Sequence, residues 1–80
     1  MKLPRDLDGR ALAHALCKHW DYRNVHQSGS HIILQTETPG HQRIPVPDHS
    51  PLRIGTLNAI LRLIAEHKQV SREQILATLR

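Results

Sequence analysis

The stretch "HQSGSHIIL", from His26 to Leu34, holds the turn and the strand that decide the fold. Ser28-Gly29 is a turn signal, because glycine adopts the positive φ angles that tight turns require. The apolar and β-branched residues after it predict a strand over His31–Thr36. The strand therefore begins with a histidine directly after a turn, which is not a typical first residue for a buried strand.

Further strands are expected on both sides of this one. The first covers Tyr22–Gln27, and the third covers Gln42–Val46, after the Pro39-Gly40 turn. Strands joined by such short turns pair in the antiparallel sense. Proline cannot donate to a central ladder, so Pro45 and Pro47 place the third strand at an edge of the sheet or end it early.

A helix is predicted before the sheet. Leu12 and Leu16 are four residues apart and form one apolar stripe on a helix of about Gly9–His19. Asp8 precedes this helix and is expected to cap it, because its carboxylate can accept hydrogen bonds from the first free backbone N–H groups.

Two helices are predicted after the sheet. The apolar residues between Ile54 and Ile64 repeat at the spacing of a longer helix. Ser71 and Gln74 fit a capping box that opens a third helix over Arg72–Leu79. The order α-β-β-β-α-α predicts an α+β fold: a three-stranded antiparallel sheet with the helices packed on one face. A chain of 80 residues has room for a single domain, over positions 1–80.

The charge balance of the chain is basic. Eleven Lys and Arg residues against seven Asp and Glu residues give a formal net charge of +4. Such a surface favours a polyanionic partner, which is nucleic acid, an anionic membrane or an acidic protein. The plain alternative is a soluble protein that is basic without such a partner.

The single cysteine and the lack of long apolar runs indicate the compartment. Cys17 is the single cysteine, so the chain can form neither an intramolecular disulfide nor a cysteine-based zinc site. This fits a reducing environment. Cys17 itself is interpreted as a small apolar packing residue. The N-terminal residues contain no apolar segment typical of a signal peptide, and no apolar run approaches the roughly 20 residues that span a bilayer. We therefore expect a cytoplasmic protein with no membrane partner.

The alternation of the central strand decides where its histidine points. The more apolar face of the strand consists of Ile32, Leu34 and Thr36. We place this face against the helices. His31 then shares the other face with Ile33 and points away from the helical layer, where solvent or a ligand can reach it. The opposite assignment would make Ile33 a core residue and bury His31.

Short motifs occur in a fixed order along the chain. Gly29-Ser30-His31 precedes the apolar strand, Val46-Pro47 is followed by His49, and Gly55-Thr56-Leu57 opens the long helix. Over about residues 8–79, this set and its spacing resemble the HicA (YcfA-type) family of toxins, the RNA-cleaving partners of HicB antitoxins.

The resemblance implies a double-stranded-RNA-binding-domain-like fold and the activity of a ribosome-independent mRNA interferase. It implies His31 as the catalytic residue, mRNA as the substrate and a HicB-like antitoxin as the protein partner. The chemistry agrees, because RNA carries its own nucleophile, the 2′-hydroxyl, and histidine can transfer protons near neutral pH. No metal and no other cofactor is expected.

The two residues before the candidate catalytic histidine are expected to assist it. Gly29 would let the backbone approach a phosphate closely, and Ser30 could donate a hydrogen bond to it. A second proton carrier is not decided by the sequence. His26, His41 and His49 are candidates, and the plainer interpretation of each is a polar surface residue.

Basic residues predict where RNA binds. Arg23 and Arg43 lie on the strands that flank the central strand, and Arg can hold a phosphate bidentately. Arg53 precedes the long helix, whose free N–H groups could bind another phosphate, and His49 belongs to the Val-Pro-x-His stretch. With few aromatic residues to stack on bases, we expect weak sequence specificity. Ile33 lies beside the candidate catalytic residue and is a candidate binding site for the antitoxin.

Two other functions remain open from the sequence. A non-catalytic RNA-binding module on the same scaffold would keep the basic residues without depending on His31. A metal-binding protein would use some of the seven histidines, but no pair of them has the i, i+4 helical or tight-loop spacing that metal sites use.

Overall fold

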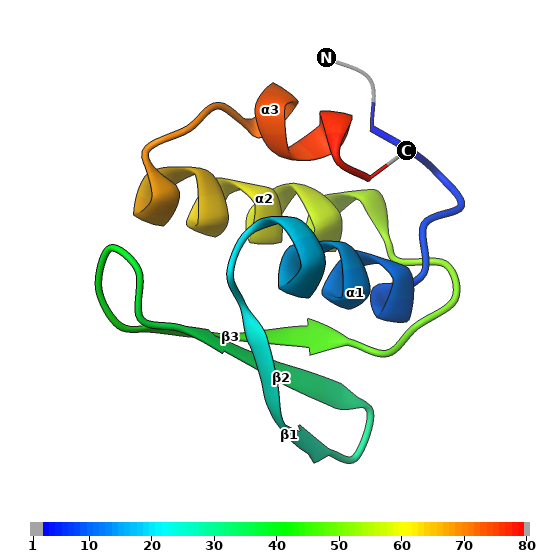
Figure 1. Ribbon diagram of the computed structural model, residues 1–80. Helices are drawn as coiled ribbons and strands as arrows, with labels where there is room; N and C mark the ends of the chain where they lie inside the picture. Colours follow the sequence, from blue (N-terminus) through cyan, green and yellow to red (C-terminus); the bar gives the residue numbers. More distant parts are fainter. Residues whose placement is uncertain (1–2, 80) are drawn as a thin grey trace.

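The computed structural model describes residues 3–79, in which a sheet forms one layer and the helices form the other (Figure 1). The helices cover one face of the sheet and leave its other face open. The elements are α1 (Gly9–His19), β1 (Arg23–Ser28), β2 (His31–Thr36), β3 (Gln42–Pro47), α2 (Ile54–Lys68) and α3 (Arg72–Ala77). The predicted α+β class and the order α-β-β-β-α-α are confirmed.

β2 is the central strand of an antiparallel sheet with the order β1-β2-β3. Its inward residues are Ile32, Leu34 and Thr36, which are each at most 3% exposed. His31 is exposed and Ile33 is half-buried on the opposite face. The predicted orientation of this strand is confirmed, and the reversed assignment is excluded.

The inward face of the sheet and the helices enclose one cluster of buried side chains. Its fully buried aliphatic members include Leu12, Leu16, Leu34, Ile44, Val46, Leu57, Leu61, Ile64 and Ile75. Burial of a side chain of this size contributes roughly 1.5–3 kcal/mol. The cluster therefore supplies most of the attraction between the two layers.

β3 lies at an edge of the sheet, as its prolines predict. Val46 points into the core, whereas Pro45 and Pro47 stand opposite Ile33 and His31 on the open face. Because proline has no N–H group, both residues make this edge a poor template for a further strand. The strand continues one residue beyond its predicted end, to Pro47.

The start of α1 is held by backbone contacts and not by a side-chain cap. Asp8 occupies the N-cap position, but its carboxylate accepts a hydrogen bond from Ser50 Oγ (2.6 Å) and none from the helix. The N–H of Gly9 donates to the carbonyl of His49 (2.9 Å). The predicted cap is therefore wrong, because the loop after β3 comes close enough to supply an acceptor for a free helical N–H group.

Gly9 is also where α1 and the end of β3 touch. A Cβ atom at this position would lie 1.8 Å from the carbonyl oxygen of Pro47 and 3.2 Å from the Cα of Asp48. Both atoms belong to the backbone, so no flexible side chain could move away. Glycine is required here because the two backbones are in direct contact.

A polar corner joins the end of β2 to the end of α2 and was not anticipated from the sequence. Lys68 Nζ donates to Thr36 Oγ1 (2.9 Å) and to the carbonyl of Thr38 (2.6 Å). The ammonium group also lies 4.8 Å from the centre of the Tyr22 ring. Burial lowers the pKa of Lys68, and the nearby carboxylate of Asp21 opposes this shift. The corner satisfies the hydroxyl of Thr36, which is the polar residue on the inward face of β2.

Tyr22 is predicted as the first strand residue but lies before β1. The residue is 2% exposed, and its N–H donates to the carbonyl of Leu16 (3.3 Å). The preceding Asp21 has a positive φ of 62°. Tyr22 therefore belongs to the segment that connects α1 to β1, and its side chain packs in the core.

The last helix is shorter than predicted. The capping box of Ser71 and Gln74 at its start is confirmed. The helix ends at Ala77, before the predicted Leu79. The hydroxyl of Thr78 accepts a hydrogen bond from Trp20 Nε1 (2.9 Å), which fixes this end of the helix to the residue after α1.

Gly9→Ala is expected to destabilise the fold by about 2 kcal/mol, the range found for overpacked positions. The added methyl group would force the start of α1 away from the end of β3. Gly55→Ala is the matched control, because a Cβ at Gly55 meets nothing within 4 Å and alanine favours a helix by about 0.5–1 kcal/mol. Urea unfolding measures both variants, and a Gly9→Ala protein as stable as the wild type would contradict the contact.

Tyr22, in the polar corner, should lose its proton at a higher pH than a tyrosine in an unfolded chain. Burial raises the pKa of Tyr22 to about 12, compared with about 10 in an unfolded chain. Below the unfolded pKa, Tyr22 is protonated in both states and its contribution to folding stability is fully present. As the pH rises from the unfolded pKa through the folded pKa, the unfolded chain releases the proton first, so this contribution is lost. An ultraviolet titration of the single tyrosine measures the folded pKa. A midpoint at the unfolded value would contradict the burial, and Tyr22→Phe should remove this alkaline loss.

Candidate active site

The open face of the sheet carries His31. Its side chain is exposed at the first position of β2, opposite Ser28 on β1 and Pro47 on β3. It points outward because the next residue, Ile32, points into the core. The imidazole is therefore accessible to a ligand from the side that the helices do not cover.

The turn before His31 is tied to the loop after β3. Gly29 has a φ of 57°, in the left-handed region that favours glycine. The carbonyl of Ser30 accepts a hydrogen bond from the N–H of Asp48 (2.6 Å). This bond brings the Gly-Ser turn, the histidine and the backbone next to His49 to the same end of the sheet.

An open groove of about 440 Å³ begins at His31 and leads to α2. Pro45 and Pro47 line its sheet side, and Gly55 and Thr56 line its helix side. The lining is largely apolar and, within residues 3–79, includes no Lys or Arg. The groove therefore places an apolar surface directly beside the imidazole.

Sequence reasoning missed this groove, because its walls come from segments far apart in the chain. One signal was available in Leu63, which stands outside the apolar stripe that includes Ile60 and Ile64. Leu63 also lines the groove and is 46% exposed. A single exposed aliphatic residue is ordinary, but Leu63 shares the groove with Pro45 and Pro47, and together they form a contiguous apolar surface.

His26 is the histidine that the strand register places beside His31. It pairs with Ile33, so it lies on the open face, and it is a diagonal neighbour of His31. Such diagonal neighbours lie about 7–8 Å apart. The side chain of His49 is exposed in the loop after β3. Of the candidate second proton carriers, His26 is the one that the strand register places beside His31.

His41 is held at the other end of β2. It lies just before β3, and its Nδ1 is 3.1 Å from Oε2 of Glu37. Hydrogen bonds from the side chain of Gln35 and then from His41 hold the pKa of the Glu37 carboxyl below its ordinary value. This pair adjoins the last residue of the strand, whereas His31 is the first.

Arg23 and Arg43 flank β2, as predicted, but they stand opposite Gln35 and not opposite His31. Arg43 donates from Nε (3.1 Å) and from a terminal nitrogen (2.8 Å) to Gln35 Oε1. Gln35 is about 13 Å from His31 along the strand, at about 3.3 Å per residue. The two arginines are therefore placed to contact phosphates other than the one at His31.

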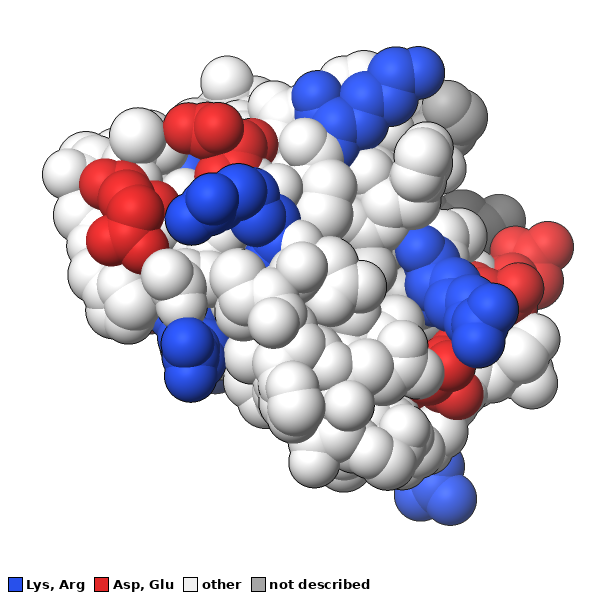
Figure 2. Space-filling view, turned by 60° about the horizontal axis from the view of Figure 1, so that its bottom comes forward, with Lys and Arg blue, Asp and Glu red and all other residues white. Residues whose placement is uncertain are grey.

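The expected basic surface consists of separate cations. In Figure 2, which turns the lower side of Figure 1 forward, a broad uncharged area occupies much of the view and the Lys and Arg atoms lie around it. Arg53 is exposed at the N-cap of α2, next to the groove residues Gly55 and Thr56. Gly29, Ser30 and His31 thus lie at one end of the open face, whereas Arg23 and Arg43 lie near its other end.

The described residues offer little for metal, thiol or membrane chemistry. Within residues 3–79, no three His, Cys, Asp or Glu side chains lie together so that they could hold a metal ion. Cys17 is half-buried, and burial raises the pKa of its thiol, which disfavours the reactive thiolate. In the same part of the chain, no helix has the length and apolar character needed to cross a membrane.

The fold and the open-face histidine define a small α+β protein that presents an imidazole on the uncovered side of its sheet. Residues 9–65 match the model of a family described as HicA toxin of bacterial toxin-antitoxin systems. This match spans α1, the whole sheet and most of α2, which is more than half of the chain. The chain therefore belongs to the HicA toxin family, and the predicted resemblance is confirmed. No curated protein and no solved structure gives a significant match.

Proposed function

We propose that this toxin is a ribosome-independent endoribonuclease that cleaves mRNA in the cytoplasm and is neutralised by a HicB-like antitoxin. The observation that carries the proposal is the exposed side chain of His31 on the open face of the sheet, directly after the Gly29-Ser30 turn. Membership of a toxin family supports it.

In the proposed reaction, the protein transfers protons and the RNA supplies the nucleophile. His31, as a neutral imidazole, takes the proton from a 2′-hydroxyl, and the 2′-oxygen attacks the adjacent phosphorus. The bond between phosphorus and the 5′-oxygen breaks, and the 5′-oxygen takes up a proton. The products are a 2′,3′-cyclic phosphate and a free 5′-hydroxyl. Neither a metal ion nor a covalent protein intermediate enters these bond changes.

His26 is the preferred acid for the leaving oxygen. It shares the open face with His31 as a diagonal neighbour, so one imidazole can accept a proton while the other donates one across the same phosphate. Histidine suits both roles because its reference pKa is about 6.5, near neutral pH.

The turn and the following loop would hold the reacting phosphate. Gly29 has no side chain to obstruct it, and the hydroxyl of Ser30 can donate a hydrogen bond. His49 and Arg53, in and after the loop that follows β3, would contact the neighbouring backbone. The free N–H groups at the start of α2 add positive potential there.

Arg23 and Arg43 would hold a more distant part of the RNA strand. Their position opposite Gln35 sets them apart from His31 along the sheet. A single strand that follows the open face can reach both places. These contacts would add affinity that falls with salt, since each phosphate contact releases counterions.

The antitoxin would cover the apolar part of the open face. Ile33 is half-buried between Pro45 and His26, and the exposed Leu63 lines the groove next to His31. A partner that buries Ile33 and fills the groove also covers His31. Inhibition then follows from blocked access and needs no change in the fold.

His31→Ala should abolish RNA cleavage and leave the fold intact. Positioned proton transfer contributes about 10²–10⁴ in rate, so we expect a loss of at least about a hundredfold. The side chain is exposed, and its removal should not alter the urea unfolding midpoint. A gel assay with labelled RNA measures cleavage, and a parallel titration measures RNA affinity.

Matched variants sharpen this test. His41→Ala removes a histidine that is held by Glu37 and should cleave like the wild type, whereas His26→Ala should be impaired. RNA with 2′-deoxy sugars should resist cleavage, and a chelator should have no effect. A His31→Ala protein that cleaves like the wild type would refute the proposal. A wild-type protein that binds RNA and never cleaves it would identify a non-catalytic binding module.

A further inference from the structure

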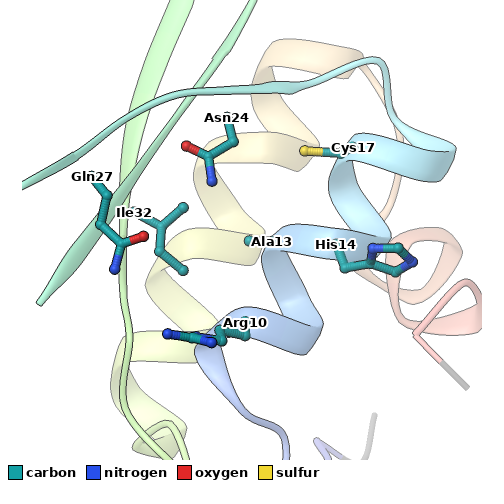
Figure 3. Close-up of a pocket in the computed structure, with 7 residues that line it drawn as sticks. All are labelled: Arg10, Ala13, His14, Cys17, Asn24, Gln27 and Ile32. Carbon is teal, nitrogen blue, oxygen red and sulfur yellow. The ribbon is translucent and has the colours of Figure 1, made fainter.

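A second hollow lies on the inward side of the sheet, between α1 and β1 (Figure 3). It is open to solvent and has a volume of about 530 Å³. Ala13 and Ile32 give it an apolar floor, and the side chains of Arg10, Asn24 and Gln27 surround this floor. None of these residues belongs to the groove at the candidate active site.

An irregularity in β1 directs two amide side chains toward this hollow. Asn24 and Gln27 both pair with inward-facing residues of β2, although they are three positions apart. In a regular strand, residues three apart point to opposite faces. The register shift between Asn24 and His26 accommodates Val25 as an extra residue, which returns the strand to the same face.

The polar groups around the hollow are available to a ligand. The side chains of Asn24 and Gln27 are exposed, and neither makes a hydrogen bond to another residue within positions 3–79. Each amide offers an acceptor oxygen beside N–H donors. Arg10 binds Asp48 through Nε (3.2 Å to Oδ2), which leaves its terminal nitrogens able to donate.

We propose that this hollow binds one unpaired nucleotide of the RNA substrate. The base would lie over Ala13 and Ile32, with its edge on the two amides and its phosphate near Arg10. An unpaired base has flat apolar faces and a rim of donors and acceptors, and proteins recognise such bases by these edges. Asn and Gln side chains are suited to this because one amide can form two hydrogen bonds to a base edge. The inference rests on the proposed function, which makes RNA the substrate.

The hollow and the candidate active site lie back to back at one end of the hairpin. Gln27 faces the hollow, and the next residue, Ser28, stands opposite His31 on the open face. An RNA strand that passes around the outer edge of β1 would place one base in the hollow and a nearby phosphodiester at His31. Cleavage would then depend on the base at one fixed distance from the cut. This gives sequence preference without aromatic stacking.

The test measures RNA binding separately from cleavage. The full chain with His31→Ala is titrated with oligoadenylate, oligouridylate, oligocytidylate and oligoguanylate, with fluorescence anisotropy as the readout. One base should bind better than the weakest by about five- to a hundredfold, the discrimination expected of a bidentate edge contact. Adding Asn24→Ala and Gln27→Ala should remove this preference. Val25→Ala, on the same strand but outside the hollow lining, should retain it.

The possible outcomes separate this inference from the proposed function. Equal affinity for all bases, or a preference that survives loss of both amides, would overturn the nucleotide site. Base preference in a wild-type protein that does not cleave RNA would reject the nuclease and keep the site. Circular dichroism confirms that each variant is folded.

Discussion

The alternation of β2 is the constraint on which the rest of the structure depends. Ile32 and Leu34 fill the core between the sheet and the helices, and a shift of one residue would exchange the two faces of the strand. Such a shift would expose these side chains and bury His31. The hydrophobic effect that holds the layers together therefore also keeps the imidazole on the open side.

The two ends of β2 are held by different kinds of contact. At the His31 end, backbone contacts join the hairpin turn, the loop after β3 and the start of α1, with Gly9 as the residue that permits the close approach. At the other end, Lys68 and Thr36 form a polar corner that links α2 to the sheet. At the His31 end these bonds are made by backbone groups, so the side chain of His31 stays exposed and available for chemistry.

Local signals made part of this account predictable from sequence. The strand predicted over His31–Thr36 has the same bounds as β2, and the outward orientation of the His31 side chain follows from the alternation. The partner of Asp8 could not be predicted, since it is set by a loop distant in the chain. The same holds for the distance between Arg43 and the histidine, which depends on strand register. The hollow between α1 and β1 was also missed. No local sequence pattern predicts the irregularity at Val25 that places the side chains of Asn24 and Gln27 on the inward face.

The central claim is that the reacting phosphodiester of RNA lies at His31 on the open face. Nuclear magnetic resonance of the histidine rings in the wild-type protein tests it most directly, with an uncleavable RNA whose 2′-hydroxyls are methylated. The ring signals of His31 should shift on binding, whereas those of His67, whose Nε2 lies 2.7 Å from the carbonyl oxygen of Gly40, should stay in place. RNA that binds without moving the His31 signals would contradict the account.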